Sequence, residues 1–161
     1  MKQARERFGP HLDGRQWSIA AVATRQYANL DFEGAHAYSS TAIPTDRGHN
    51  AVYTFGKYSV KFPQDLLRAF LNIGQTSEAT IACPDENTFY THRQRSHYCF
   101  TVSEEQGLAY LDSIKKDMLI ARAGNFVYQI ESENCAKWAH EKIEAVVGAH
   151  RIPNVFQMPL S

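Results

Sequence analysis

Cys135 is well placed to act as a nucleophile, because it lies where a turn is expected to become a helix. Apolar residues recur at three- and four-residue spacing from Trp138 to Val147, which predicts an amphipathic helix over 134–147 that ends at Gly148. A thiol in the first turn of a helix faces unpaired N–H groups and the positive end of the helix dipole, and both favour the thiolate. The N–H of Cys135 can also bind a developing oxyanion.

The same cysteine has a structural interpretation. Free cysteines are often small buried hydrophobes, and Cys135 stands at helical spacing from Trp138 and Ala139. In that case the chain is a non-enzymatic protein-binding module, and the thiol is part of its core. A single cysteine predicts a nucleophile only together with a matched base, so the choice depends on the histidines.

The sequence contains seven histidines that could supply this base. His140 follows Cys135 by about 500° of helical rotation, so it points away from the thiol. His36 and His49 are the candidates, because each is expected at the start of a strand in the sheet that the last helix has to cover. Either could also be a hydrogen-bonded residue of that sheet. The other four are expected in loops or ends as solvated surface residues, namely His11, His92, His97 and His150.

The elements that must position these residues are an early sheet and later helices. Three strands joined into an antiparallel meander are expected over 17–27, 36–43 and 51–60. One helix is expected from Pro63 to about Gly74. The capping box at 103–106 begins another, with an apolar face of Leu108, Leu111, Ile114 and Met118. Short strands are expected over 80–83, 88–92 and 97–102. The sequence thus predicts an α+β fold in which the helix of Cys135 comes last.

The composition indicates one compact domain over residues 1–161, with a core of about 17–148. Lys plus Arg and Asp plus Glu both number 17, so the chain lacks the basic surface of a nucleic-acid-binding protein. Cys83, Cys99 and Cys135 form no Cys-x-x-Cys pair, which argues against structural zinc and favours a reducing compartment. A metal site of His36, His49 and Cys135 is a further alternative, but close-spaced ligand pairs are missing.

Neither a membrane span nor a secretory signal is expected. The longest apolar runs, such as 19–23, are far too short to cross a bilayer. The charged segment 1–7 is not followed by the apolar stretch of a signal peptide. We therefore expect a cytoplasmic protein, or one exported without a classical signal peptide.

The order of these motifs resembles that of a known group of enzymes. A strand histidine, a second polar residue one strand later and Asn-Cys at the start of a late helix are similar to circularly permuted papain-like domains. This is the group of lecithin retinol acyltransferase and its NlpC-related peptidase relatives. The stretches 34–38 (Gly-Ala-His-Ala-Tyr) and 134–139 (Asn-Cys-Ala-Lys-Trp-Ala) also look like a subset found among bacterial effector proteins. The resemblance covers roughly 17–148, although the segment 76–97 has no counterpart in it.

The resemblance implies a papain-like fold in permuted order, with the antiparallel sheet first and the nucleophile helix late. It implies a thiol-dependent hydrolase or acyltransferase that acts through a thioester, as a peptidase, deamidase or acyltransferase on a protein or acyl substrate, without a cofactor. Cys135 takes the place of the nucleophile, His36 that of the base, and His49 that of the second histidine of acyltransferase members. Which histidine is the base stays open. His49, or failing it Asn50 or Tyr53, would orient the imidazole.

Overall fold

The computed structural model describes residues 15–26, 36–61, 74–89, 93–129 and 132–148. These residues form six strands, two α-helices and one short 3₁₀ turn. The strands are β1 (Trp17–Gln26), β2 (His36–Pro44), β3 (Asn50–Ser59), β4 (Thr76–Ala82), β5 (Arg93–Val102) and β6 (Val127–Gln129). The helices are α3 (Glu104–Arg122) and α4 (Cys135–Val147), and the 3₁₀ turn is η1 (Glu86–Thr88).

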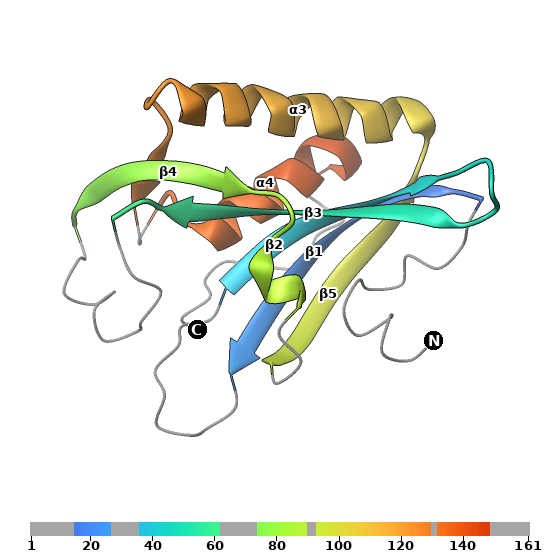
Figure 1. The fold of residues 1–161 in the computed structure, drawn as a ribbon, viewed down its shortest axis with the longest axis horizontal. Helices are drawn as coiled ribbons and strands as arrows, with labels where there is room; N and C mark the ends of the chain where they lie inside the picture. Colours follow the sequence, from blue (N-terminus) through green and yellow to red (C-terminus); the bar gives the residue numbers. More distant parts are fainter. Residues whose placement is uncertain (1–14, 27–35, 62–73, 90–92, 130–131, 149–161) are drawn as a thin grey trace.

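All six strands belong to one antiparallel sheet, in the order β5-β1-β2-β3-β4-β6 (Figure 1). The meander predicted for the first three strands is confirmed, and so is the α+β class with a helix late in the chain. Strand β3 changes its partner along its length. Residues 50–55 pair with β2, whereas residues 56–59 pair with β4. The two strands β2 and β3 therefore separate beyond the pair Ser39↔Phe55, and this is the end of β2 at which His36 lies.

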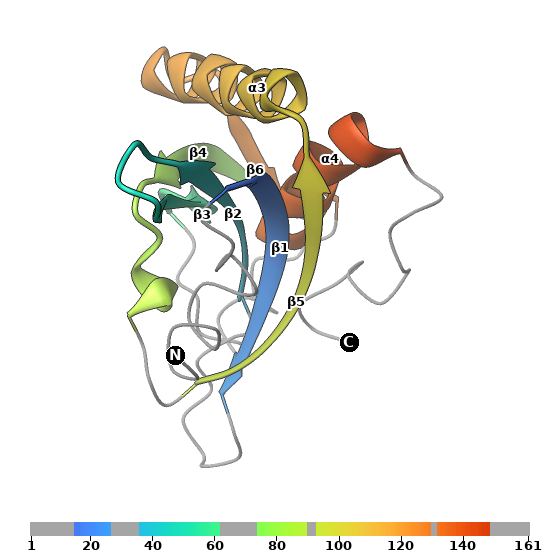
Figure 2. The same cartoon turned by 90° about the vertical axis from the view of Figure 1, so that its right-hand side faces the viewer.

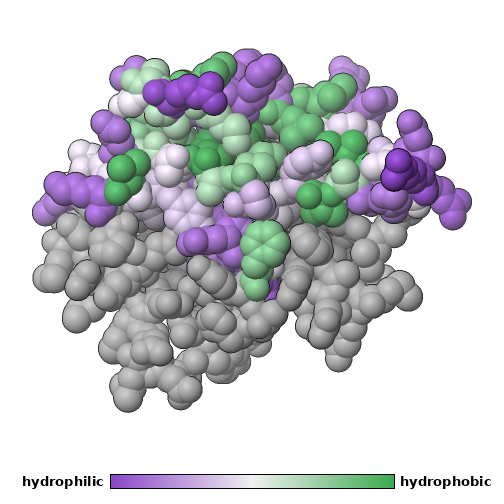
Figure 3. All heavy atoms as spheres, in the orientation of Figure 1, coloured by the Kyte–Doolittle hydropathy of each residue, from purple (hydrophilic) through white to green (hydrophobic). Residues whose placement is uncertain are grey.

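Both helices pack on one face of this sheet, α4 over β1, β2 and β3, and α3 beside α4 and against β4 and β1 (Figures 1 and 2). Alternate strand residues point toward the helices and form the core with apolar side chains of α3 and α4. The buried members are Ile19, Ala21, Ala37, Phe55, Val102, Tyr110, Ile114, Ala136, Trp138, Ala139 and Ile143. Burying one large apolar side chain of this kind contributes about 1.5–3 kcal/mol. In Figure 3, polar side chains lie mainly around the margin of the described part, and apolar ones gather over its middle.

Helix α3 begins at the capping box that the sequence predicts. Ser103 Oγ accepts a hydrogen bond from the N–H of Gln106 (3.1 Å), and the N–H of Ser103 donates to Gln106 Oε1 (3.0 Å). Most of the predicted apolar face is confirmed, because Ile114 is buried and Leu111 and Met118 pack against the core. Leu108 is the exception at 52% exposure, and Tyr110, which was not predicted, is buried. None of the helices in the described part has the length and hydropathy that a bilayer span needs.

Three of the shorter predicted elements differ from the structure. The strands expected over 80–83 and 97–102 are longer, because β4 begins at Thr76 and β5 at Arg93. The strand expected over 88–92 is wrong at its first two residues, because Thr88 ends the 3₁₀ turn that Asp85 caps and Phe89 follows it in a helical conformation. Residues 90–92 lie outside the described residues. The helix expected from Pro63 to Gly74 lies, except for its last residue, outside the described residues.

Helices α3 and α4 are joined by a polar contact at their interface. The indole Nε1–H of Trp138 donates to Asp117 Oδ2 (2.8 Å), and Lys142 Nζ lies 2.5 Å from the same oxygen. Lys142 Nζ also donates to Ser113 Oγ (2.8 Å). Because Trp138 is 4% exposed, this network fixes the direction of α4, and with it the place of Cys135 at its first turn.

Substituting Trp138→Phe should lower the free energy of unfolding by about 1–3 kcal/mol. The smaller ring retains most of the packing but leaves Asp117 without the indole donor. Urea denaturation of the wild type and the variant measures the difference. A change within error of zero would show that the indole hydrogen bond does not hold α4 against α3.

Candidate active site

Cys135 is the first residue of α4, as predicted. Asn134 caps the helix, because its side-chain Oδ1 accepts a hydrogen bond from the N–H of Lys137 (2.9 Å) while its own backbone stays extended. The turn before it is closed by the N–H of Glu133, which donates to the carbonyl of Gln129 (2.9 Å). Cys135 is buried, with 3% of its surface exposed. The positive end of the helix dipole therefore acts on a thiol that water screens only weakly.

His36 is the first residue of β2 and is also buried, at 2% exposure. It pairs with Thr24 of β1, and the Thr24 hydroxyl donates to the His36 carbonyl (3.2 Å). Since β2 and β3 separate at this end, α4 can begin beside the start of β2. The side chains of His36 and Cys135 are in hydrogen-bonding contact. The structure thus brings together the two residues that the sequence analysis paired.

The electrostatics of this pair favour the charged forms of both groups. Burial alone would lower the pKa of His36, but the charges of Cys135 and Asp85 and the hydrogen bonds to them raise it to about 10. Burial alone would likewise raise the pKa of Cys135, but the His36 imidazolium, the N–H of Ala37 and the Tyr128 hydroxyl lower it. Thiolate and imidazolium stabilise each other, which is the ion pair that makes a cysteine nucleophilic near neutral pH.

Asp85 is a third member of this group, and the sequence analysis did not identify it. Its Oδ2 lies 2.7 Å from His36 Nε2 and accepts its hydrogen bond. Because Nε2 is taken by Asp85, Nδ1 is the ring nitrogen left for the Cys135 thiol. An acid that holds one nitrogen while the other faces the nucleophile fixes the orientation and the tautomer of the imidazole. We refer to Cys135, His36 and Asp85 below as the cysteine–histidine–aspartate cluster.

Asp85 is fully buried and held by its own short turn. Its Oδ1 accepts hydrogen bonds from the N–H of Asn87 (2.8 Å) and from the Tyr58 hydroxyl (2.9 Å), and its N–H donates to Thr54 Oγ1 (3.0 Å). Burial alone would raise the pKa of this carboxyl, but the charge and hydrogen bond of His36, together with those two donors, lower it. The acid therefore stays ionised against His36 although it is withdrawn from water.

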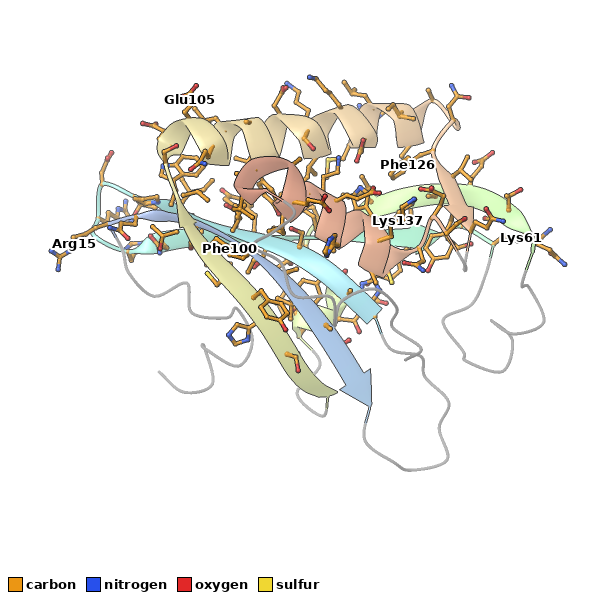
Figure 4. All side chains as sticks on the ribbon, turned by 180° about the vertical axis from the view of Figure 1, so that it is seen from behind. Arg15, Lys61, Phe100, Glu105, Phe126 and Lys137 are labelled. Atoms are coloured by element: carbon orange, nitrogen blue, oxygen red, sulfur yellow. The ribbon has the colours of Figure 1, made fainter. Side chains whose placement is uncertain are left out.

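Tyr128 is a further residue in contact with Cys135. Its hydroxyl donates to the Cys135 side chain and accepts a hydrogen bond from the Cys135 backbone N–H. Burial and the neighbouring thiolate raise the pKa of Tyr128, so the phenol keeps its proton. The Tyr128 hydroxyl and the Cys135 N–H are thus two donors beside the sulfur, the first engaged by the sulfur and the second by the Tyr128 oxygen. In Figure 4, Phe126 from the segment before Tyr128 and Lys137 from the first turn of α4 are labelled in the half of the described part away from Arg15.

His49, the second predicted site residue, does not lie with this cluster. It is exposed in the turn between β2 and β3, where its carbonyl accepts hydrogen bonds from Thr45. His36 and Pro44 mark opposite ends of β2, and at about 3.3 Å per residue that turn is roughly 26 Å from His36. Asn50 and Tyr53 belong to the same distant half of β3. The expectation that one of these residues orients the imidazole is therefore corrected, and Asp85 does so instead.

The remaining histidines also lie away from the thiol or cannot be placed. His140 pairs with Glu144 one turn further along α4 (3.0 Å). His97 lies on β5 and is exposed, as expected of a surface residue, while His11, His92 and His150 are outside the described residues.

A metal site of His36, His49 and Cys135 is not assembled by this fold, because His49 lies at the far end of β2. Within the described ranges, no group of three or more His, Cys, Asp or Glu side chains is arranged as a metal site.

For two of the site residues that the sequence analysis did not identify, Asp85 and Tyr128, a local sequence pattern could have indicated a fixed position. Pro84-Asp85-Glu86-Asn87 is a turn pattern in which an aspartate bonds the N–H two residues on, and such a residue is fixed in place. Tyr128 belongs to the short extended segment that leads into the turn before Cys135. Nothing in the sequence indicated Tyr58, which reaches Asp85 only through the pairing of β3 with β4.

Comparison of the chain with protein-family models, with curated proteins and with solved structures found no match.

Proposed function

We propose that this protein is a thiol-dependent hydrolase or acyl transferase of papain-like type in permuted order. Cys135 is the nucleophile, His36 the base, and Asp85 the residue that orients the imidazole. The observation that carries the proposal is the arrangement of three buried residues from distant parts of the chain, in which Asp85 Oδ2 holds His36 Nε2 at 2.7 Å and His36 contacts the Cys135 thiol. Burying an ionised aspartate and a charged histidine lowers the free energy of unfolding unless the two charges pair fully. Buried charged groups of this kind cluster at functional sites, which supports a catalytic role.

In the first half of the reaction, the Cys135 thiolate attacks the carbonyl carbon of an amide, ester or thioester. A carbon–sulfur bond forms, and the sulfur loses its negative charge to the carbonyl oxygen. The Tyr128 O–H then turns from the sulfur to that oxygen and releases the Cys135 N–H, so that both donors stabilise the oxyanion. The His36 imidazolium then gives its proton to the leaving amine, alcohol or thiol as the bond to it breaks. Asp85 keeps the imidazole in place and stabilises its charged form.

In the second half, neutral His36 takes a proton from the molecule that resolves the thioester. Water gives a carboxylic acid and a hydrolase, whereas an amine or alcohol gives a new amide or ester and a transferase. The carbon–sulfur bond breaks, and the ion pair of Cys135 and His36 is restored. Side chains perform every proton transfer in this sequence, so we propose no cofactor. The substrate is a protein or another acyl compound.

A structural role for Cys135 is the alternative that its burial favours, at 3% exposure. The two proposals differ in the reactivity of the thiol. A core cysteine stays inert until the protein unfolds, whereas a thiolate held by His36 reacts in the native state.

Iodoacetamide labelling followed by mass spectrometry, cysteine by cysteine and over a range of pH, tests the proposal. The thiolate of Cys135 exists above its lowered pKa, and the imidazolium exists below about pH 10. Labelling of Cys135 should therefore already be rapid near pH 6 and should not fall in alkali, because alkylation needs only the thiolate. Acyl transfer should fall as the pH rises through about 10, because the leaving group then receives no proton from His36.

Cys83 and Cys99 are internal controls for this measurement. Burial raises the pKa of both thiols, and that of Cys99 to about 11, so they should label slowly at pH 6. In His36→Ala, labelling of Cys135 at pH 6 should slow at least about tenfold. Slow labelling of Cys135 in the wild type, unaffected by His36→Ala, would contradict the enzyme proposal and favour the structural role.

A further inference from the structure

Tyr58 closes a ring of contacts behind the cysteine–histidine–aspartate cluster. Its aromatic ring stacks on the His36 imidazole, with centroids 4.6 Å apart and planes at 28°. Its hydroxyl donates to Asp85 Oδ1 at 2.9 Å, while Asp85 Oδ2 holds His36 at 2.7 Å. One residue therefore contacts the base with its ring and the acid with its hydroxyl.

The hydroxyl of Tyr58 is itself oriented. Asn87 Nδ2 donates to its oxygen at 2.9 Å, which directs the phenolic proton toward Asp85. Burial, and then the charge of Asp85 and the hydrogen bond to it, raise the pKa of Tyr58, and Glu86 adds to the same effect. Tyr58 therefore remains a donor across the pH range in which the cluster is charged.

The carboxylate of Asp85 needs such donors. A buried carboxylate offers about four acceptor sites, and leaving one unsatisfied costs about 1–3 kcal/mol or more. Tyr58 Oη and the N–H of Asn87 both bind Oδ1, so Oδ2 is free to bind His36. Without the tyrosine hydroxyl, the carboxylate is less stable as an anion and its plane is less fixed.

We propose that Tyr58 is a positioning residue of the active site, whose ring sets the imidazole plane of His36 and whose hydroxyl fixes the Asp85 carboxylate. Four residues then act together to activate Cys135: the thiol itself, His36, Asp85 and Tyr58, each in contact with the next. This inference rests on the proposed function. Tyr58 does not act on the substrate, because its hydroxyl is occupied by Asp85 and Asn87.

The test is Tyr58→Phe, which keeps the ring over His36 and removes the hydroxyl. Loss of this donor makes Asp85 a weaker partner for the imidazolium, and the imidazolium in turn stabilises the Cys135 thiolate less. The midpoint of the iodoacetamide labelling profile of Cys135 should rise by about half to one pH unit, which slows labelling on the acid limb about threefold to tenfold. A merely structural role would lower the melting temperature without moving this midpoint.

Tyr110→Phe is the matched control. It removes another buried phenolic hydroxyl, which bonds Ser39 Oγ at 2.6 Å in the core between the sheet and α3. It should lower stability and leave the labelling midpoint of Cys135 where it is in the wild type. Asn87→Ala is a second variant, in case Tyr58→Phe does not fold. It frees the hydroxyl of Tyr58 to turn away from Asp85 and should move the midpoint in the same direction, by a smaller amount.

The outcomes separate this inference from the proposed function. A raised midpoint in Tyr58→Phe or Asn87→Ala, with none in Tyr110→Phe, supports the positioning role. A wild-type midpoint in both variants overturns it and leaves the enzyme proposal intact. A wild type in which Cys135 labels as an ordinary thiol overturns the proposed function itself.

Discussion

Cys135→Ser is expected to abolish acyl transfer while the protein stays folded. A hydroxyl in place of the thiol has a far higher pKa, so His36 cannot hold it as an anion, and turnover should fall by about a thousandfold or more. The fold should tolerate the exchange, because serine is nearly the same size and finds polar partners in the same place. These are the imidazole of His36, the Tyr128 hydroxyl and the N–H of Ala37.

Turnover of a p-nitrophenyl ester and a thermal melt, measured on the same preparations, check this expectation. Cys99→Ser and Cys83→Ser are matched controls, since each makes the same exchange elsewhere in the sheet and its turns and should keep the wild-type turnover. A large drop in melting temperature for Cys135→Ser, together with a wild type that never forms an acyl adduct on Cys135, would identify a core thiol instead.

The sequence predicted the helix of Cys135 and the strand of His36 because both are set by local signals. The spacing of apolar residues after Cys135, and Gly148 behind them, define α4 without reference to the rest of the chain. The first three strands follow from their own residue types and turns. That His36 would meet Cys135 could be proposed, since a helix that covers a sheet must begin near one end of some strand.

The remote place of His49 follows from the predicted antiparallel meander itself, so the expectation that it lies near His36 was wrong on topology alone. Pro44 pairs with Asn50, so the turn that carries His49 lies at the end of β2 remote from His36. Two histidines on neighbouring strands are close only if pairing brings them to the same end of the sheet. In an antiparallel hairpin, the residues nearest the turn are those furthest from the start of the first strand.

Asp85 could not be predicted because tertiary pairing alone brings it to His36. Strand β4 pairs with the second half of β3, after β3 has left β2, and the turn beyond β4 then folds back over the start of β2. This is the segment for which the resemblance to permuted papain-like domains offered no counterpart. The turn pattern around Asp85 could have indicated that this side chain has a fixed position, but not that His36 is its partner.

Gly56→Ala should destabilise the protein and disable the cluster together. A Cβ at this position would lie 1.7 Å from Asp85 Oδ2 and 2.8 Å from its Cγ. The carboxylate cannot move aside at little cost, because His36, Tyr58 and Asn87 all hold it. We expect a loss of about 2–4 kcal/mol in the free energy of unfolding. Labelling of Cys135 at pH 6 should slow at least about tenfold, because a displaced acid no longer stabilises the imidazolium.

Gly107→Ala is the control that separates the two effects of Gly56→Ala, the loss of stability and the slower labelling of Cys135. Its Cβ would lie 2.2 Å from Trp17 Cε3, so it creates a clash of similar severity against an apolar ring between α3 and β1. Stability should fall, but the labelling of Cys135 in the folded protein should match the wild type.

A double variant of Gly56→Ala with Asp85→Ala tests whether the clash with Asp85 is the cause of the lost stability. Since the clash partner is then absent, Gly56→Ala should cost clearly less stability in the Asp85→Ala background than in the wild type. Equal costs in both backgrounds would mean that Gly56 is needed for a reason other than space for Asp85.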